Sequence, residues 1–288
     1  MNKKIKNFLF LGRYHKPYGS FLLMFPCFWG LAINSFLTLE SLKIYFLFAV
    51  GSFIMRGAGC TINDILDLEF DKKVKRTKKR PLANGDINIK EAYFFLIIQL
   101  LLGLIILLNF NQTIIFNSLL IVPLVFAYPL LKRITFFPQV VLGILFNWGI
   151  LLSGSYFENF DNIKIITLFL GGVFLTIGYD TIYAYQDIKD DKKIGLKSLA
   201  LKTFNRPKTF ITLIYLLSFI FFSISILISF PLNFLSLLLI IFIFIHLSWQ
   251  ITQIKLMHQE VLQNIFTSNV YLGSLIFVGL LINKNSYF

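Results

Sequence analysis

Long apolar stretches that recur along the whole chain constrain its fold more than any other feature. A helix needs about 20 mostly apolar residues to cross a bilayer. The chain is 57% hydrophobic and only 14% charged, whereas soluble domains carry about 25% charged residues. We therefore predict an all-α integral membrane protein with nine transmembrane helices around a central cavity. The predicted spans are residues 18–37, 44–66, 91–109, 112–131, 138–156, 163–186, 209–229, 232–252 and 266–283.

The sequence predicts one domain over its whole length. No Gly-, Ser- or Pro-rich linker divides the chain, so residues 1–288 are expected to form a single polytopic membrane domain. The basic N-terminus precedes an apolar stretch but lacks a small-residue cleavage site, so we expect the first span to be retained. Cys27 and Cys60 fall inside apolar segments, which indicates small buried residues and no disulfide framework.

The distribution of basic residues predicts the orientation in the membrane. The net charge of +13 could suggest a nucleic-acid partner, but Lys and Arg occur in short runs between apolar stretches. With the N-terminus inside, the inner segments hold 23 basic residues and the outer segments hold 3. Membrane proteins show this bias toward the cytoplasmic side. We therefore expect a multi-pass protein of a bacterial inner membrane, in contact with lipid and with no nucleic acid, whose N-terminus and active site are cytoplasmic.

Two acidic clusters stand out, because they hold eight of the 14 acidic residues. Each cluster lies at the cytoplasmic end of a predicted span, and acids at membrane depth are costly and usually functional. Helical spacing (i, i+4) puts Asn63, Asp67 and Asp71 on one face, and Asp187 and Asp191 on another. The two clusters are Asp64, Asp67, Glu69 and Asp71, and Asp180, Asp187, Asp190 and Asp191.

Oxygen-rich stripes on two helices predict a divalent-cation site between them. Mg²⁺ prefers oxygen ligands and typically takes one or two carboxylates together with substrate phosphates. Lys and Arg follow the first cluster at residues 72–80, and Lys residues surround the second cluster at residues 189–197. Such basic residues could clamp a pyrophosphate. A network of mutual salt bridges without any ligand is the alternative.

The two clusters also suggest an internal repeat. Asp67 and Asp191 are 124 residues apart, and four predicted spans lie between the clusters. The clusters thus fall at corresponding ends of the second and sixth spans, on the same side. We predict a pseudo-repeat of four-helix units.

Arg56 is a cation inside a predicted span. It lies seven residues before Asn63, so it shares that helix face and sits about 10 Å deeper in the membrane. An intramembrane Arg must face a cavity or a partner. Two interpretations stay open: a buried pair with a carboxylate or a helix carbonyl, and an anion contact for a substrate.

The motifs around the clusters resemble those of a known family. Gly57–Ile87 is similar to the first signature of the UbiA-type intramembrane prenyltransferases, NDxxDxxxD followed by RTxxRPL. Tyr179–Ser198 is similar to the second signature, YDTxYAxxD followed by GxKS. Tyr128–Gly143 resembles the loop that joins helices four and five. The details GAGCTxND and YDTIYAYQD look most like the 4-hydroxybenzoate polyprenyltransferase branch, which acts in ubiquinone synthesis.

The resemblance implies a reaction. Mg²⁺ would bridge the Asp clusters and the diphosphate of a polyprenyl donor, and the ring of 4-hydroxybenzoate would attack the allylic cation ortho to its hydroxyl. Asp191 is our choice for the acid that takes the ring proton. The implied catalytic residues are Asp67, Asp187, Asp191 and Arg133. The implied metal-side residues are Asn63, Asp64, Asp67, Asp71, Asp187, Asp190 and Asp191. The implied substrate-binding residues are Arg56, Arg76, Arg80, Lys132, Arg133, Tyr183 and Lys197.

Two alternatives remain at this point. Another branch of the same superfamily would use a different acceptor, namely haem, a chlorophyll precursor, dihydroxynaphthoate or a glycerol phospholipid. A secondary transporter would place its acids near the centre of spans, whereas here they lie at the ends, beside basic loops. A structural membrane protein would not need two such clusters.

Overall fold

The structure is a computed structural model that describes residues 3–74, 76–156, 161–254 and 258–286. Lys75 and Lys255, two of the basic residues counted for the orientation, lie outside the described residues. The described chain is a bundle of helices with no strand among its residues. The helices are α1 (Lys3–Leu11), α2 (Tyr18–Ala32), α3 (Leu39–Leu66), α4 (Leu68–Asp71), α5 (Ile89–Leu107), α6 (Gln112–Ile134), α7 (Pro138–Gly154), α8 (Asn162–Ala184), η1 (Tyr185–Asp187), α9 (Ile188–Ile194), α10 (Leu199–Thr203), α11 (Pro207–Ser229), α12 (Phe234–Gln253) and α13 (Gln259–Asn285).

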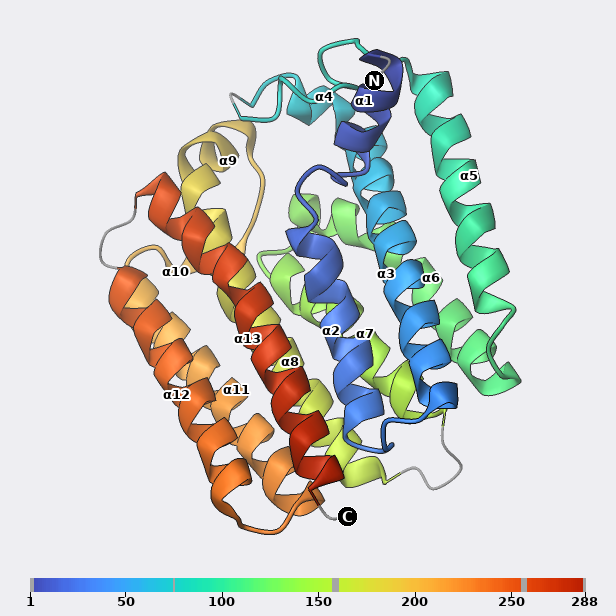
Figure 1. The fold of residues 1–288 in the computed structure, drawn as a ribbon. Coiled ribbons are helices and arrows are strands. Elements are labelled where there is room, and N and C mark those ends of the chain that lie inside the picture. Colours follow the sequence, from blue (N-terminus) through green and yellow to red (C-terminus); the bar gives the residue numbers. More distant parts are fainter. Residues whose placement is uncertain (1–2, 75, 157–160, 255–257, 287–288) are drawn as a thin grey trace.

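The prediction of an all-α multi-pass membrane protein is confirmed. Among the described residues, 7 helices are long and apolar enough to cross a bilayer: α3, α5, α6, the stretch from α8 to α9, α11, α12 and α13. The two other predicted spans correspond to the shorter apolar helices α2, of 15 residues, and α7, of 17 residues. The exact count of nine spans therefore stays a prediction. In Figure 1, α1 and the end of α13 lie at opposite ends of the bundle, as an odd number of spans requires.

Polar residues and prolines begin the helices where the sequence breaks its apolar runs. The side chains of Asn88, Asn111 and Asn233 each accept a hydrogen bond from the backbone of the first turn, at the starts of α5, α6 and α12. Such caps satisfy backbone N–H groups that have no partner within the helix. Pro138 and Pro207 occupy the first positions of α7 and α11, where a missing N–H costs nothing. The predicted spans that end at residues 109 and 229, and those that begin at 112, 138 and 232, therefore meet real breaks between helices.

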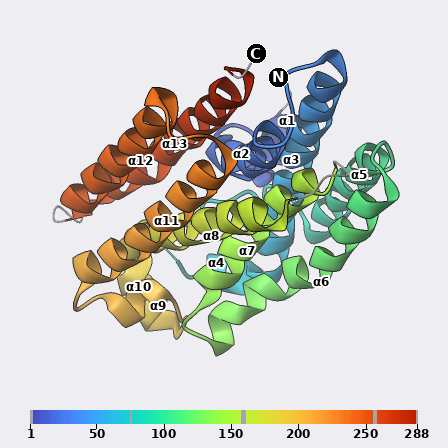
Figure 2. The same ribbon diagram turned by 90° about the horizontal axis from the view of Figure 1, so that it is seen from below.

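The helices form an inner group and a peripheral one. α8 packs against α7 and α11, and α2 packs against α3, α7 and α13. About two-thirds of the apolar window of α8 (67%) is buried, whereas only 11% of that of α6 is buried. Figure 2 shows α8 and α7 between α11 on one side and α6 on the other. Because lipid tails are as apolar as the exposed Leu, Ile and Phe side chains of α5 and α6, a bilayer is the solvent that suits these helices.

Both acidic clusters lie where a long helix gives way to a short one. α3 ends at Leu66, Asp67 leaves the helical conformation, and α4 begins at Leu68. α8 ends at Ala184 and is followed by η1 and α9. The N–H of Asp67 still donates to the carbonyl of Asn63, and the N–H of Asp71 to the carbonyl of Asp67, so the predicted i, i+4 relation of these residues is kept across the break. Asp favours helix ends, because its short carboxylate competes for the backbone N–H groups. The two breaks are alike, but the four-helix repeat itself stays a prediction.

Candidate active site

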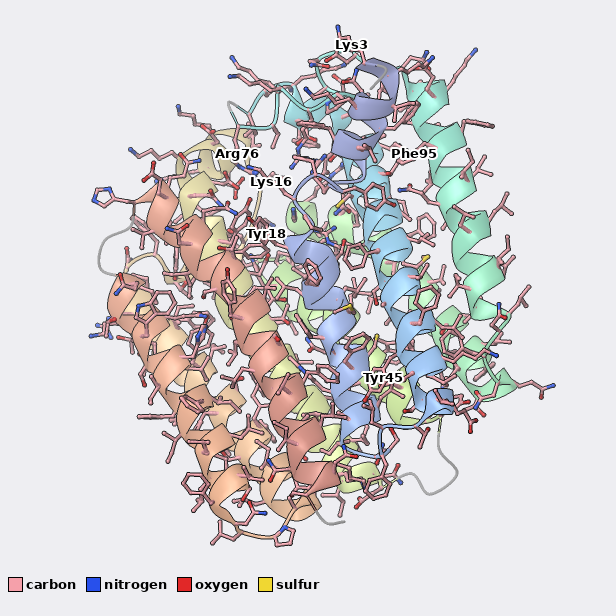
Figure 3. All side chains as sticks on the ribbon, in the orientation of Figure 1. Lys3, Lys16, Tyr18, Tyr45, Arg76 and Phe95 are labelled. Atoms are coloured by element: carbon pink, nitrogen blue, oxygen red, sulfur yellow. The ribbon has the colours of Figure 1, made fainter. Side chains whose placement is uncertain are left out.

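A cavity of about 1320 Å³ opens within the bundle, between α2, α3, α5, α6, α7 and α8. One end is charged and lies near α4 and α9. In Figure 3, Arg76 and Lys16 lie toward this end, whereas Tyr45 lies toward the opposite end of the bundle. The opposite end of the cavity is apolar, and its lining includes Leu47, Phe48, Phe110, Ile114 and Leu152. The cavity thus joins a polar head region to a long hydrocarbon region.

Most of the predicted site residues line this one cavity. The structure brings together acids from both clusters and cations from α3, from α6 and from two loops. Asp64, Asp190 and Arg133 are described by the structure but lie outside the lining. The predicted residues that line the cavity are Asn63, Asp67, Asp71, Asp187, Asp191, Arg56, Arg76, Arg80, Lys132, Tyr183 and Lys197.

Asp67 is held at the end of α3 by neighbouring cations. The guanidinium of Arg133 donates to the carbonyl of Leu66 at 2.9 Å and lies 3.5 Å from a carboxylate oxygen of Asp67. Burial raises the pKa of Asp67, and the nearby charges of Lys132 and Arg133 oppose that rise. Arg133 therefore contacts Asp67 from outside the cavity lining, and its catalytic role stays a prediction.

Asp64 belongs to a buried ion-pair network and not to the cavity wall. Its side chain is 2% exposed, and both carboxylate oxygens accept hydrogen bonds from Arg13, at 2.8 and 2.9 Å. Arg80 donates to Asp64 at 2.9 Å and to Asp71 at 2.6 Å. Arg13 also has a positive φ of 60° and donates to the carbonyl of Phe10 at the end of α1. Asp64 thus joins the N-terminal segment to the loop that carries Arg80.

The second cluster is tied to the first by Arg76. The guanidinium of Arg76 donates to both oxygens of Asp187, at 2.8 and 2.7 Å. This two-point geometry is the strong form of a charge-assisted pair. Asp191 lines the same cavity one helical turn further along the chain. A loop from the first half of the molecule therefore completes the site of the second half.

Gly195 and Lys197 determine the conformation of the loop that follows α9. Gly195 has φ of 73°, a left-handed conformation that ends α9 and costs glycine little. The chain then turns so that the backbone N–H of Lys197 donates to the carbonyl of Lys132 at 2.8 Å, and its Nζ donates to the carbonyl of Ile134 at 3.2 Å. Lys132 and Lys197 therefore meet at the same edge of the cavity.

Arg56 faces the cavity about two turns below the acidic end. Within the described chain no carboxylate pairs with it: its guanidinium donates to the Cys60 sulfur at 2.6 Å, while Nε is buried without a hydrogen-bond partner. The guanidinium also lies 5.5 Å from the centre of the Phe146 ring and packs against Gly19 of α2. Among the described residues, Arg56 thus has no hydrogen bond to a carboxylate or a helix carbonyl, and its contact with a substrate anion stays a prediction.

The residues at the acidic end suit a hard cation. In the described residues, no three His, Cys, Asp or Glu side chains come together as a ready-made metal cage. Mg²⁺ does not need such a cage when substrate phosphates supply further oxygens. Asn63, Asp67 and Asp191 place amide and carboxylate oxygens on one cavity, and the neighbouring cations suit phosphate oxygens. The donor set therefore fits Mg²⁺ bound together with a diphosphate.

Comparison with known proteins agrees with this chemistry. Residues 23–275 match the UbiA prenyltransferase family. The chain belongs to this family. It is therefore a prenyltransferase, and both the resemblance and the enzyme class predicted from the sequence are confirmed.

Relatives of this UbiA-family enzyme cover most of its length. It is 38% identical to 4-hydroxybenzoate geranyltransferase 1 of Lithospermum erythrorhizon over 291 residues, which is 98% of this chain and 92% of that protein. It is 45% identical over 215 residues to the mitochondrial 4-hydroxybenzoate polyprenyltransferase of Arabidopsis thaliana, which is 73% of this chain and 52% of that protein.

Solved structures of UbiA homologues share the fold. The apo structure of a homologue from Aeropyrum pernix K1 has a TM-score of 0.77 at 21% identity and covers 92% of this chain and 98% of that chain. A homologue from Archaeoglobus fulgidus, bound to GPP and Mg²⁺, has a TM-score of 0.67 at 18% identity and covers 94% of this chain and 99% of that chain.

Asp180 is a cavity residue of this UbiA-family enzyme that sequence reasoning left out of the predicted site. It lines the same cavity as Asp187 and Asp191. It lies seven residues before Asp187, which is two helical turns and nearly the same face. The same seven-residue spacing linked Arg56 to Asn63, so the signal was present in the sequence.

Proposed function

We propose that the enzyme transfers a polyprenyl group from polyprenyl diphosphate to the ring carbon of 4-hydroxybenzoate that is ortho to the hydroxyl. The observation that carries this proposal is the order of groups along one cavity. Acids and cations at one end suit a diphosphate, Arg56 below them suits a carboxylate, and the apolar remainder suits a prenyl tail. The names of the relatives point to the same acceptor, and ubiquinone synthesis is the pathway that those names fit.

The acidic end would bind the donor's diphosphate. Asn63, Asp67, Asp187 and Asp191 would hold Mg²⁺, with Asp71 supporting them from the same cavity. When bound, Mg²⁺ stabilises the negative charge that develops on the departing diphosphate. Arg76, Arg80, Lys132 and Lys197 would supply hydrogen bonds and positive charge to the same oxygens. Asp64 and Asp190 lie outside the lining, and Asp64 would act by holding Arg13 and Arg80 in place.

The bond cleavage, the ring attack and the proton transfer would all take place between the side chains that line the cavity. Breaking the bond between the allylic carbon and the diphosphate oxygen leaves both electrons on the diphosphate. The apolar part of the cavity excludes water, which would otherwise consume the allylic cation. The ring carbon then forms the new carbon–carbon bond, and the ring proton passes to a carboxylate, for which Asp191 is our choice. The ring of Tyr183, 5.8 Å from the guanidinium of Arg76, lines the wall where the cation forms.

The acidic end is proposed to face the cytoplasm of a bacterium. The excess of basic residues in the segments at this end supports that orientation. Some relatives are named as mitochondrial, so a mitochondrial membrane is the alternative location.

Product formation tests the proposed function directly. In membranes supplied with 4-hydroxybenzoate and geranyl diphosphate, we expect a prenylated benzoate with Mg²⁺ present and none after EDTA treatment, because the carboxylates need a cation to bind the diphosphate. Chromatography with mass detection measures the product. Dihydroxynaphthoate and haem serve as competing acceptors in parallel reactions. Turnover of one of these, with no turnover of 4-hydroxybenzoate, would contradict the proposed acceptor.

Arg56→Ala tests the carboxylate contact. A hydrogen bond to a charged group contributes about 1.5–3 kcal/mol, so we expect the KM for 4-hydroxybenzoate to rise about 10- to 100-fold. The KM for the donor should change little, and Arg56→Lys should recover part of the loss. Steady-state kinetics in nanodiscs, with each substrate varied in turn, measures both constants. Equal rises in both KM values would argue against a contact with the acceptor alone.

A further inference from the structure

Gly59 differs from twelve other helical glycines, among them Gly19, Gly57 and Gly178. At each of those, an added methyl group would lie 3.4 Å or closer to a neighbouring atom, so the position is in close contact with its surroundings. A methyl group added at Gly59 would meet nothing within 4 Å. Gly59 lines the cavity, so the open space beside it is the cavity itself.

A glycine at this position has a cost that packing does not explain. Glycine in a helix interior is about 1 kcal/mol less favourable than alanine. Glycines in membrane helices usually repay this cost by letting two backbones approach closely. At Gly178, for example, the ring of Tyr215 fills the space that a side chain would take. No neighbour fills that space at Gly59, so the backbone of α3 itself forms the cavity wall there.

The place of Gly59 along α3 shows which part of the cavity it keeps open. It lies three residues after Arg56 and four residues before Asn63. At about 100° per residue, the three positions fall within roughly 60° of one another on the helix. Arg56 and Asn63 are about 10 Å apart along the axis, and Gly59 lies between them. The open wall therefore lies between the proposed carboxylate contact and the proposed diphosphate end.

We propose that Gly59 is a specificity-determining residue for the aromatic acceptor. Its bare backbone forms a flat wall against which the ring lies, with the carboxylate toward Arg56 and the reacting edge toward Asn63. A side chain at this position would occupy the slot of the ring, whereas the prenyl tail extends into the rest of the cavity. This role rests on the proposed function, because it assumes a planar aromatic acid as the acceptor.

Gly59→Ala and Gly59→Leu in the full-length enzyme test this role. One extra carbon in a tight pocket changes specificity by about 10- to 200-fold. We therefore expect Gly59→Ala to raise the KM for 4-hydroxybenzoate about tenfold, and Gly59→Leu to lower kcat/KM for this acceptor at least about 100-fold. The KM for geranyl diphosphate should stay within about twofold of the wild-type value. Both constants are measured in nanodiscs, with the other substrate saturating.

Gly51→Ala is the matched control on the same helix. It lines the same cavity eight residues earlier in α3, about 12 Å deeper, where the new methyl group would lie 3.4 Å from Ile106. We expect its KM for 4-hydroxybenzoate to equal that of the wild type. Alanine is a better helix former than glycine, so Gly59→Ala keeps the test decisive if Gly59→Leu does not fold.

The outcomes separate this inference from the proposed function. If the wild type makes no product from 4-hydroxybenzoate, the proposed function fails. If the wild type is active and the Gly59 variants keep its acceptor KM, or raise the KM of donor and acceptor equally, the role of Gly59 is wrong. The same conclusion follows if Gly51→Ala raises the acceptor KM as much as Gly59→Ala does.

Discussion

Asp67→Asn should insert into the membrane normally and lose prenyl transfer by about 10³-fold or more in kcat. A bound divalent cation supplies several kcal/mol of charge stabilisation in a transition state, and each 1.36 kcal/mol corresponds to a factor of ten in rate. Asn keeps the shape of Asp67 but lacks the negative charge that holds a cation. Single-turnover assays with saturating Mg²⁺ measure the loss, and Asp187→Asn should behave alike because it lines the same cavity.

Glu69→Gln is the matched control for this prediction. Glu69 lies in α4, two residues from Asp67, but its side chain is 73% exposed and pairs with Lys72 at 2.6 Å. Exposed ion pairs of this kind contribute little to stability, and Glu69 does not line the cavity. We expect full activity in Glu69→Gln. Normal turnover in Asp67→Asn, with Mg²⁺ dependence retained, would show that Asp67 is not a metal ligand.

Asp64→Ala should destabilise the fold, by about 3–5 kcal/mol, because it removes one partner of a buried ion pair. Arg13 would lose its carboxylate partner and keep only its bonds to backbone carbonyls, while Arg80 would keep Asp71. Thermal unfolding of the purified protein in detergent measures the effect. The Asp67→Asn protein should unfold at nearly the wild-type temperature.

Asp86→Asn serves as the reference for Asp64→Ala. Asp86 forms a 3.7 Å pair with Lys3, and both side chains are at least 36% exposed. Its removal should leave the unfolding temperature unchanged. If the Asp64→Ala protein melts at the wild-type temperature but has lost activity, the structural role of Asp64 is wrong. Asp64 would then act as a metal ligand, as the sequence predicted.

The sequence predicted the fold well because the length of its apolar stretches is a physical constraint of a bilayer. Apolar length places helices, and the caps at Asn88, Asn111 and Asn233 confirm where they begin. Helical spacing also placed Arg56 and Asn63 correctly on one cavity.

Spacing could not separate Asp64 from Asp67, because both lie near the same helix face. Their roles differ through long-range contacts: Arg13 lies 51 residues from Asp64 in sequence. The predicted span ended at residue 66, where α3 ends, but the contact made at this end could not be predicted. Nothing in the local pattern Asn63–Asp71 shows that Arg133 binds the last carbonyl of the helix from 67 residues away.

The link between Arg76 and Asp187 also bears on how the chain is made. These residues are 111 positions apart, and polypeptides emerge and fold from the N-terminus. Asp64 finds Arg13 and Arg80 within the first quarter or so of the chain, so its buried charge is neutralised early in biogenesis. Arg76 must wait until α8 has been synthesised. The first half of the protein therefore enters the membrane with its structural charges already matched, while the guanidinium that joins the two halves gains its partner only when the second half arrives.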